Sequence, residues 1–194
     1  KTIESRAILA TPPVPQTLRL LGPAVDQIQG ELRTMLEGVE YAPTLALLLL
    51  LNGPSPLPQE GYARLGNTPG PLYWIADNSA KGISPPELGP ALTIHGEPDF
   101  SRENYDAPEE RVQERLLHEF QRLYPPQGRY AIAEAQLKKW RYARPLRPTQ
   151  ERAYSLGSRL PPAAVAGDAF GGARVEGAYL SGLAAAQLID AALG

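Results

Sequence analysis

Apolar residues along this chain gather in short runs separated by glycine and proline. Five runs predict strands, because each is short and bounded by turn-forming residues: Ser5–Ala10, Thr44–Leu51, Leu72–Ala76, Ala91–Ile94 and Ala163–Ala166. The first and last runs are apolar and rich in small residues, which is typical of parallel strands covered by helices on both faces. The leucine-rich run at Thr44–Leu51 predicts a central strand that is buried on both faces.

Helical periodicity is clearest between Asp106 and Pro125, where apolar residues recur every three or four positions. Glu109 and Glu110 fall in the first turn of this segment, where acidic side chains complement the positive end of the helix dipole. Shorter helices are expected at Pro15–Leu21 and Glu31–Leu36, and a long one at Arg174–Leu193.

Ala131–Tyr142 alternates with a period of two, which predicts an amphipathic strand. We expect its polar and aromatic face to line a cleft or meet solvent. Residues 143–162 are rich in proline and arginine and predict a loop. The residues on the polar and aromatic face are Ile132, Glu134, Gln136, Lys138, Trp140 and Tyr142.

The order of these elements predicts an α+β fold with a mixed, largely antiparallel sheet flanked by helices, because the crossovers are not uniform βαβ units. Glycine and proline together make up 39 of the 194 residues, which favours short elements and many turns. Tyr41–Gln59 is uncharged, but four prolines interrupt it, so it does not read as a membrane helix.

Composition excludes several chemistries. The chain has no cysteine and two histidines, so disulfides, thiolate catalysis and multi-histidine metal cages are excluded, and we expect no metal site. The net charge of −2 argues against a basic surface for nucleic acid or membranes. These features fit a cytoplasmic protein.

The segment Val165–Ala186 is the most informative stretch. A buried strand leads into Gly167 and Asp168, then into a glycine-containing loop and a helix. Glycines at such a junction let the backbone approach a ligand, and the free N–H groups at the helix start favour an acceptor. Asp168 could accept hydrogen bonds from ribose or ribityl hydroxyls. The alternative is a glycine-rich turn that caps an alanine-rich helix and binds nothing.

About 20 consecutive residues here resemble the carboxyl-terminal flavin signature of FAD-dependent amine oxidases, especially the renalase-like branch. Ala166-Gly167-Asp168 is followed by Gly171–Ala178, and Ser181-Gly182 and Ala184–Ala186 complete the match. The resemblance implies that Asp168 binds the ribityl or phosphate portion of FAD, and that the backbone of Arg174–Glu176 faces the flavin pyrimidine edge. The cofactor-binding residues it implies are Ala10, Gly167, Asp168, Gly172, Arg174, Val175 and Glu176.

Three further segments are similar to the same family. Ala7–Pro13 resembles the strand that returns to the cofactor domain, Trp74–Gly82 resembles a W-I-A-x-x-S-x-K segment, and Trp140–Ala143 matches W-R-Y-A. The second departs from the family pattern, because a Pro-Gly expected after Lys81 is absent. This departure weakens any transfer of substrate specificity.

The candidate catalytic residues are Trp140, Tyr142 and His95. The resemblance implies that Trp140 and Tyr142 line a flat aromatic slot over the flavin, whereas aromatic residues on sheets are commonly part of the core. His95 ends a strand and either titrates near neutral pH or has a structural role. Lys81 points at the flavin or is an ordinary loop residue.

The sequence contains no G-x-G-x-x-G motif, which amine oxidases use to hold the ADP half of FAD. We therefore expect a carboxyl-terminal fragment of a longer flavoprotein. Its domains would be residues 1–13 (returning strand of the FAD-binding domain), 14–150 (substrate-binding domain) and 151–194 (carboxyl-terminal part of the FAD-binding domain).

The resemblance implies hydride transfer from a small amine or dihydronicotinamide-type substrate to the flavin N5, followed by reoxidation with O₂. FAD would bind the full-length parent and be absent from this fragment, which alone would be inactive. The alternative is a non-catalytic substrate-binding or dimerising module without cofactor. Partners would be a small-molecule substrate and a second copy in a homodimer, with no nucleic acid and no membrane.

Overall fold

The computed structural model describes residues 4–66 and 69–194, so the first three residues of the predicted 1–13 segment lie outside the described part. The chain divides into two compact units, Lys1–Tyr41 with Arg144–Gly194 and Ala42–Ala143. The borders predicted at 13/14 and 150/151 separate a cofactor-binding domain from a substrate-binding domain, whereas the two units are defined by compactness alone. The predicted borders therefore stay a prediction.

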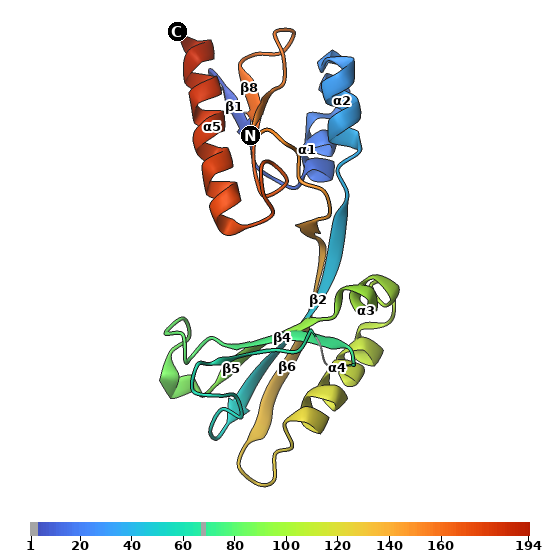
Figure 1. Ribbon diagram of the computed structural model, residues 1–194, viewed down its shortest axis with the longest axis vertical. Coiled ribbons are helices and arrows are strands. Elements are labelled where there is room, and N and C mark those ends of the chain that lie inside the picture. The colour runs from blue at the N-terminus through green and yellow to red at the C-terminus, as the bar shows by residue number, and fades with distance from the viewer. Residues whose placement is uncertain (1–3, 67–68) are drawn as a thin grey trace. The chain divides into compact units, whose positions relative to one another are not determined.

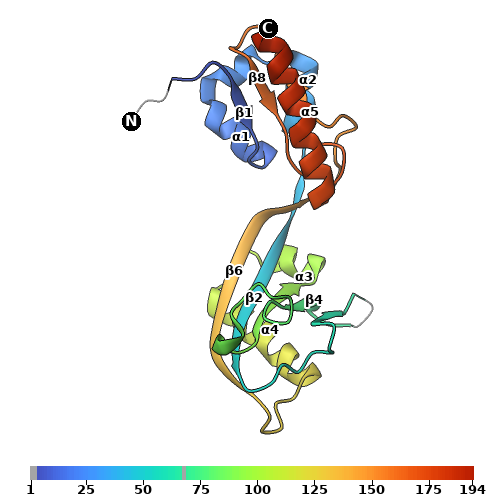
Figure 2. The ribbon, with the colours of Figure 1, turned by 90° about the vertical axis from the view of Figure 1, so that its left-hand side faces the viewer.

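The first unit contains a three-stranded sheet in the order β1-β8-β7, in which β1 and β8 are parallel and β7 is antiparallel to β8. Helices lie on both sides of this sheet (Figures 1 and 2). Its elements are β1 (Ile8–Ala10), α1 (Val14–Leu21), the 3₁₀ helix η1 (Gly22–Gln27), α2 (Gly30–Glu37), β7 (Tyr154–Ser155), β8 (Ala163–Val165) and α5 (Val175–Leu193).

Residues of the β8 segment point alternately to the two sides of the sheet, and on each side they pack closely against a helix. Ala164 and Ala166 pack with Ala185 of α5, whereas Ala163 and Val165 pack with Val14 and other residues of the α1–α2 side. The parallel pairing of β1 with β8 is confirmed, and so is the burial of β8 on both faces.

Burial of the first strand was predicted wrongly. The Ile8 side chain is 50% exposed and that of Leu9 is 42% exposed. The reason is that β1 lies at the edge of its sheet and pairs with β8 alone. An apolar run indicates a strand that is suited to burial, but the sequence does not say whether a neighbour covers it.

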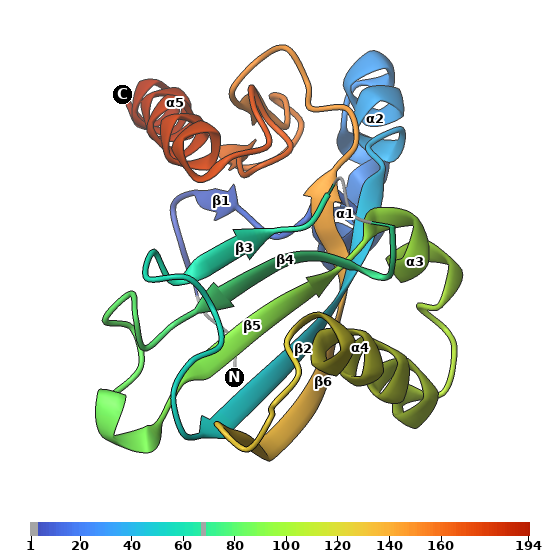
Figure 3. The same ribbon diagram turned by 60° about the horizontal axis from the view of Figure 1, so that its bottom comes forward.

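The second unit contains most of a five-stranded sheet in the order β3-β4-β5-β2-β6, and the registered pairs are antiparallel (Figure 3). Its elements are β2 (Tyr41–Asn52), β3 (Tyr62–Arg64), β4 (Leu72–Asp77), the 3₁₀ helix η2 (Pro86–Leu88), β5 (Ala91–Gly96), α3 (Pro98–Glu103), α4 (Glu109–Leu123) and β6 (Ala131–Pro145).

The core of this unit lies between the sheet and α4. Leu45, Leu47, Leu49 and Leu51 of β2 are buried there, together with the apolar face of α4 that the helical periodicity predicts. The opposite face of β2 is only half-buried at Leu48 and Leu50. The prediction of burial on both faces is therefore wrong for these two positions.

The α+β class with a mixed, largely antiparallel arrangement is confirmed. The sequence did not predict β3, the short β7 or α3, because these short elements contain no run of apolar residues of the kind that marks the other strands. Within residues 4–66 and 69–194, no helix is long and apolar enough to cross a membrane.

Candidate functional site

The loop between β8 and α5 is held in a shape that only glycine tolerates at key positions. Gly167, Gly171 and Gly172 have φ values of 142°, 72° and 149°. A Cβ on Gly177, in the first turn of α5, would lie 2.2 Å from the carbonyl oxygen of Gly172. Loop and helix therefore pack backbone against backbone at this point.

Ser181 fixes this loop to the middle of α5. Its buried hydroxyl accepts a hydrogen bond from the Gly167 N–H at 2.9 Å and donates one to the Arg152 carbonyl oxygen. A second anchor is Thr149, whose N–H donates to Ala169 and whose carbonyl accepts from Gly171. Hydrogen bonds within the chain therefore fix the conformation of this loop.

The start of α5 presents unpaired donors. Arg174 occupies the N-cap in an extended conformation, and no side chain caps the helix. The N–H groups of the first turn, from Val175 to Gly177, therefore have no intrahelical partner and point toward any acceptor at this end. Val175 is 90% exposed, and Arg174 and Glu176 are exposed too. This helix start is therefore open to an acceptor that is not part of the helix.

Asp168 lies at the carboxyl end of β8 and is partly buried. Desolvation raises the pKa of its carboxyl group, although hydrogen bonds from its own backbone N–H and that of Ala169 oppose the rise. A partly desolvated carboxylate is a strong acceptor for a ligand hydroxyl, because little water competes.

Ala10 lies beside this site, as the resemblance implies. It pairs with Val165 in the parallel register, and its carbonyl accepts the Ala166 N–H at 3.1 Å. The carbonyl oxygen of Thr11 would be 3.4 Å from a Cβ on Gly167. The structure thus brings the ends of β1 and β8 together, where parallel-sheet proteins usually bind ligands.

Tyr41 is a residue of this region that sequence reasoning missed. Its hydroxyl accepts the N–H of Val14 at 3.2 Å, at the first position of α1. Burial raises the pKa of Tyr41, and the negative charge of Asp168 raises it further. No local pattern identifies Tyr41, because it acts through contacts with segments far away in the sequence.

A second group of candidate residues lies in the other unit, on the sheet face that points away from α4. We call this face the open face. Cross-strand registers place His95 opposite Trp74 and Ala46, and Trp74 opposite Arg64. Side chains in direct register share a face, and the ring of Tyr62 stacks on that of Trp74 with centroids 5.1 Å apart. The open face comprises Ala46, Leu48, Leu50, Tyr62, Arg64, Trp74, Thr93 and His95, with Glu134 and Gln136 of β6.

His95 is half-buried on the open face, and burial lowers the pKa of its imidazole. On β6, Leu137 is buried and the Lys139 ammonium donates to the carbonyls of Tyr105 and Ala107 before α4, so alternation assigns Lys138 and Trp140 to the open face. Ile132 was predicted on that face wrongly, because it packs against the core. Trp140 is 60% exposed, which argues against a core role. Tyr142 is half-buried on the same alternation.

The segment after β4 is rigidly built. The buried Asp77 carboxylate accepts N–H bonds from Ser79 at 2.9 Å and Ala80 at 3.1 Å. The turn holds the Lys81 ammonium 6.0 Å from the centre of the Trp74 ring. Lys81 therefore lies beside the open face of its own unit.

The predicted cofactor residues thus converge at the β8–α5 junction and β1, and the predicted catalytic residues His95, Trp140 and Tyr142 share one sheet face. The two groups belong to different units. No cluster of three or more acidic or histidine side chains suited to a metal ion occurs among the described residues.

Comparison with known proteins identifies the family to which this chain belongs. The family model described as flavin containing amine oxidoreductase matches residues 1–190. Renalase from Mus musculus is 26% identical over 186 residues, which cover 94% of this chain and 53% of renalase. The chain therefore spans about half the length of this curated relative.

Two solved structures have a similar fold. A putative protoporphyrinogen oxidase from Exiguobacterium sp. 255-15 matches with a TM-score of 0.63 and 14% identity, over 96% of this chain and 41% of that protein. An oxidoreductase from Methanosarcina mazei matches with a TM-score of 0.64 and 18% identity, over 95% of this chain and 43% of that protein. At these identities the likeness concerns the fold alone.

Proposed function

Because the chain belongs to the flavin containing amine oxidoreductase family, we propose that it forms the flavin-facing part of a longer FAD-dependent oxidoreductase. The coverage of the relatives supports this, since each extends well beyond the matched region. The dinucleotide motif that would hold the ADP half of FAD is absent from these 194 residues. We propose that a segment outside them supplies it, and that these residues alone are inactive.

The residues at the β8–α5 junction fit the flavin end of FAD. Asp168 supplies an acceptor for a ribityl hydroxyl, and the first-turn N–H groups of α5 supply donors for the carbonyl edge of the ring. Gly167 and Gly172 have no side chain, so the flavin could come close to the backbone at these two positions. The observation that carries the proposal is this junction, whose loop takes backbone conformations that favour glycine at Gly167, Gly171 and Gly172.

When bound, FAD supplies a two-electron acceptor that takes a hydride from a reduced substrate. The protein's part is to position the substrate and exclude water. We propose that Trp140 and Tyr142 offer flat surfaces to the substrate. Burial lowers the pKa of His95 and so favours neutral imidazole, which would offer a ring nitrogen that can accept a proton from the substrate.

The substrate class we propose is a small reduced molecule, either an amine or a dihydronicotinamide. The aromatic pair of Tyr62 and Trp74 on the open face supports a planar substrate, and the nearby cations Lys81 and Arg64 favour one that carries an anionic group. The setting we propose is cytoplasmic.

The test uses the longer protein loaded with FAD. Asp168→Asn should weaken FAD retention by about 1–3 kcal/mol, because the charged acceptor is lost. Trp140→Ala should slow flavin reduction while flavin stays bound. Unchanged flavin affinity in the Asp168 variant would remove the assigned cofactor site, and flavin loss in the Trp140 variant would reassign that residue to cofactor retention.

A second candidate function is a cofactor-free binding module that associates with another copy. The specific observation in its favour is apolar surface on the first unit, on the edge strand β1 and along α5. Flavin absorbance in the purified chain would rule out this candidate, and we expect the chain to be colourless. The exposed residues are Ile8, Leu9, Val175, Tyr179, Leu183 and Leu188.

A further inference from the structure

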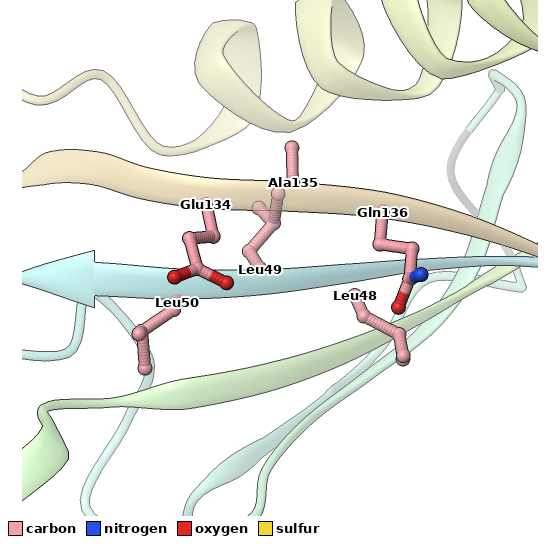
Figure 4. Close-up of a pocket in the computed structure, with 6 residues that line it drawn as sticks. All are labelled: Leu48, Leu49, Leu50, Glu134, Ala135 and Gln136. Carbon is pink, nitrogen blue, oxygen red and sulfur yellow. The ribbon is translucent and has the colours of Figure 1, made fainter.

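The open face of the second unit carries a hollow to which neither the comparisons nor the proposed flavin site assigns a role. Its volume is about 470 Å³. Figure 4 shows four of its side chains extending to one side of the paired strands β2 and β6, whereas Leu49 and Ala135 extend to the other. The four are Leu48, Leu50, Glu134 and Gln136.

Two leucine side chains form the apolar floor of the hollow. Leu48 and Leu50 are half-buried, and the direct neighbours of these leucines on β5 are Thr93 and Ala91. These neighbours are small, so the side of the hollow toward β5 stays open. A volume of this size lies within the range of roughly 300–1,000 Å³ that is usual for small-molecule sites.

The wall of the hollow is polar and has unused hydrogen-bonding groups. Glu134 and Gln136 are exposed, and within the described part of the chain their side chains form no hydrogen bond or ion pair with another residue. A carboxylate only accepts hydrogen bonds, whereas an amide both donates and accepts. A carboxylate beside two leucines therefore selects a ligand that has donor groups at one end and an apolar or planar surface beside them.

We propose that this hollow binds the hydrogen-bond-donating tail of the substrate, with Glu134 as the acceptor and Leu48 and Leu50 against the apolar part. Vicinal ribose hydroxyls and an alkylammonium group share this chemistry, and both occur in the proposed substrate classes. The identity of the ligand as part of the substrate rests on the proposed function, whereas binding of a ligand in the hollow does not.

The experiment titrates the full chain with adenosine, 2′,3′-dideoxyadenosine and hexylamine, and follows backbone amide shifts by NMR. We expect adenosine or hexylamine to shift the amides of residues 48–50 and 134–136. Glu134→Gln should weaken that binding about tenfold or more, which corresponds to about 1.4 kcal/mol. Glu110→Gln, an exposed charge removal on α4, is the matched control and should leave binding unchanged.

Binding of adenosine without binding of the dideoxy analogue would assign the hollow to ribose hydroxyls, and binding of hexylamine alone would assign it to an ammonium group. The proposal is overturned if neither probe shifts these amides, or if Glu134→Gln binds as well as the unaltered chain. No flavin is needed in this titration. Its failure is therefore distinct from a failure of the Asp168 test of the proposed function.

Discussion

Replacing Gly177 with alanine tests the idea that the β8–α5 junction is built by backbone contact. In an ordinary helix interior this change stabilises by about 0.5–1 kcal/mol, because alanine loses less entropy than glycine. Here the new Cβ would lie 2.2 Å from the Gly172 carbonyl oxygen and 2.9 Å from its carbon. Both neighbours are backbone atoms, so the loop itself must move.

Forcing a methyl group into a closely packed site costs about 1–3 kcal/mol. We therefore expect Gly177→Ala to lower the free energy of unfolding by about 1–2 kcal/mol, because the clash outweighs the gain in helix propensity. For a chain of this length each kcal/mol corresponds to a fall in melting temperature of about 2–4 °C.

Gly182 on the same helix supplies the control, because nothing lies within 4 Å of a Cβ placed there. Gly182→Ala should stabilise by about 0.5–1 kcal/mol. Both tryptophans, Trp74 and Trp140, lie in the other unit, so their fluorescence does not report on α5. Amide hydrogen exchange in α5 is the suitable measurement. Equal stabilisation by the two substitutions would refute the backbone-contact reasoning.

Two further changes probe groups whose surroundings shift their chemistry. Burial lowers the pKa of His95, so the folded unit favours neutral imidazole and should lose stability as the pH falls below the unfolded value of about 6.5. His95→Gln should reduce that loss in urea unfolding followed by tryptophan fluorescence, and an identical pH dependence in both proteins would contradict the assignment. Tyr41→Phe removes the acceptor of the Val14 N–H and should cost about 1 kcal/mol, with faster hydrogen exchange at Val14. Unchanged exchange there would mean that the Tyr41 hydroxyl does not stabilise the start of α1.

The strongest sequence patterns predicted the structure well. The alternation in Ala131–Tyr142 correctly predicted β6, and the helical spacing after Asp106 correctly predicted α4. Both segments are long enough for their hydrophobic period to show which face is buried. The signature at the β8–α5 junction likewise predicted a strand, a glycine loop and a helix in the correct order.

Features that depend on distant partners were not predictable in the same way. The pairing of Trp74 with His95 depends on strand register, which shifts between Leu72 and Trp74. The exposure of β1 depends on which strand lies at the sheet edge. Tyr41 meets α1 through a fold that no local pattern encodes.

Hydrogen exchange of the proposed longer flavoprotein, with and without FAD, is the decisive experiment. We predict that FAD slows exchange of the amides between Gly167 and Gly177, since their N–H groups and the adjoining Asp168 would contact the flavin end. Full flavin occupancy with unchanged exchange across this segment would contradict this prediction.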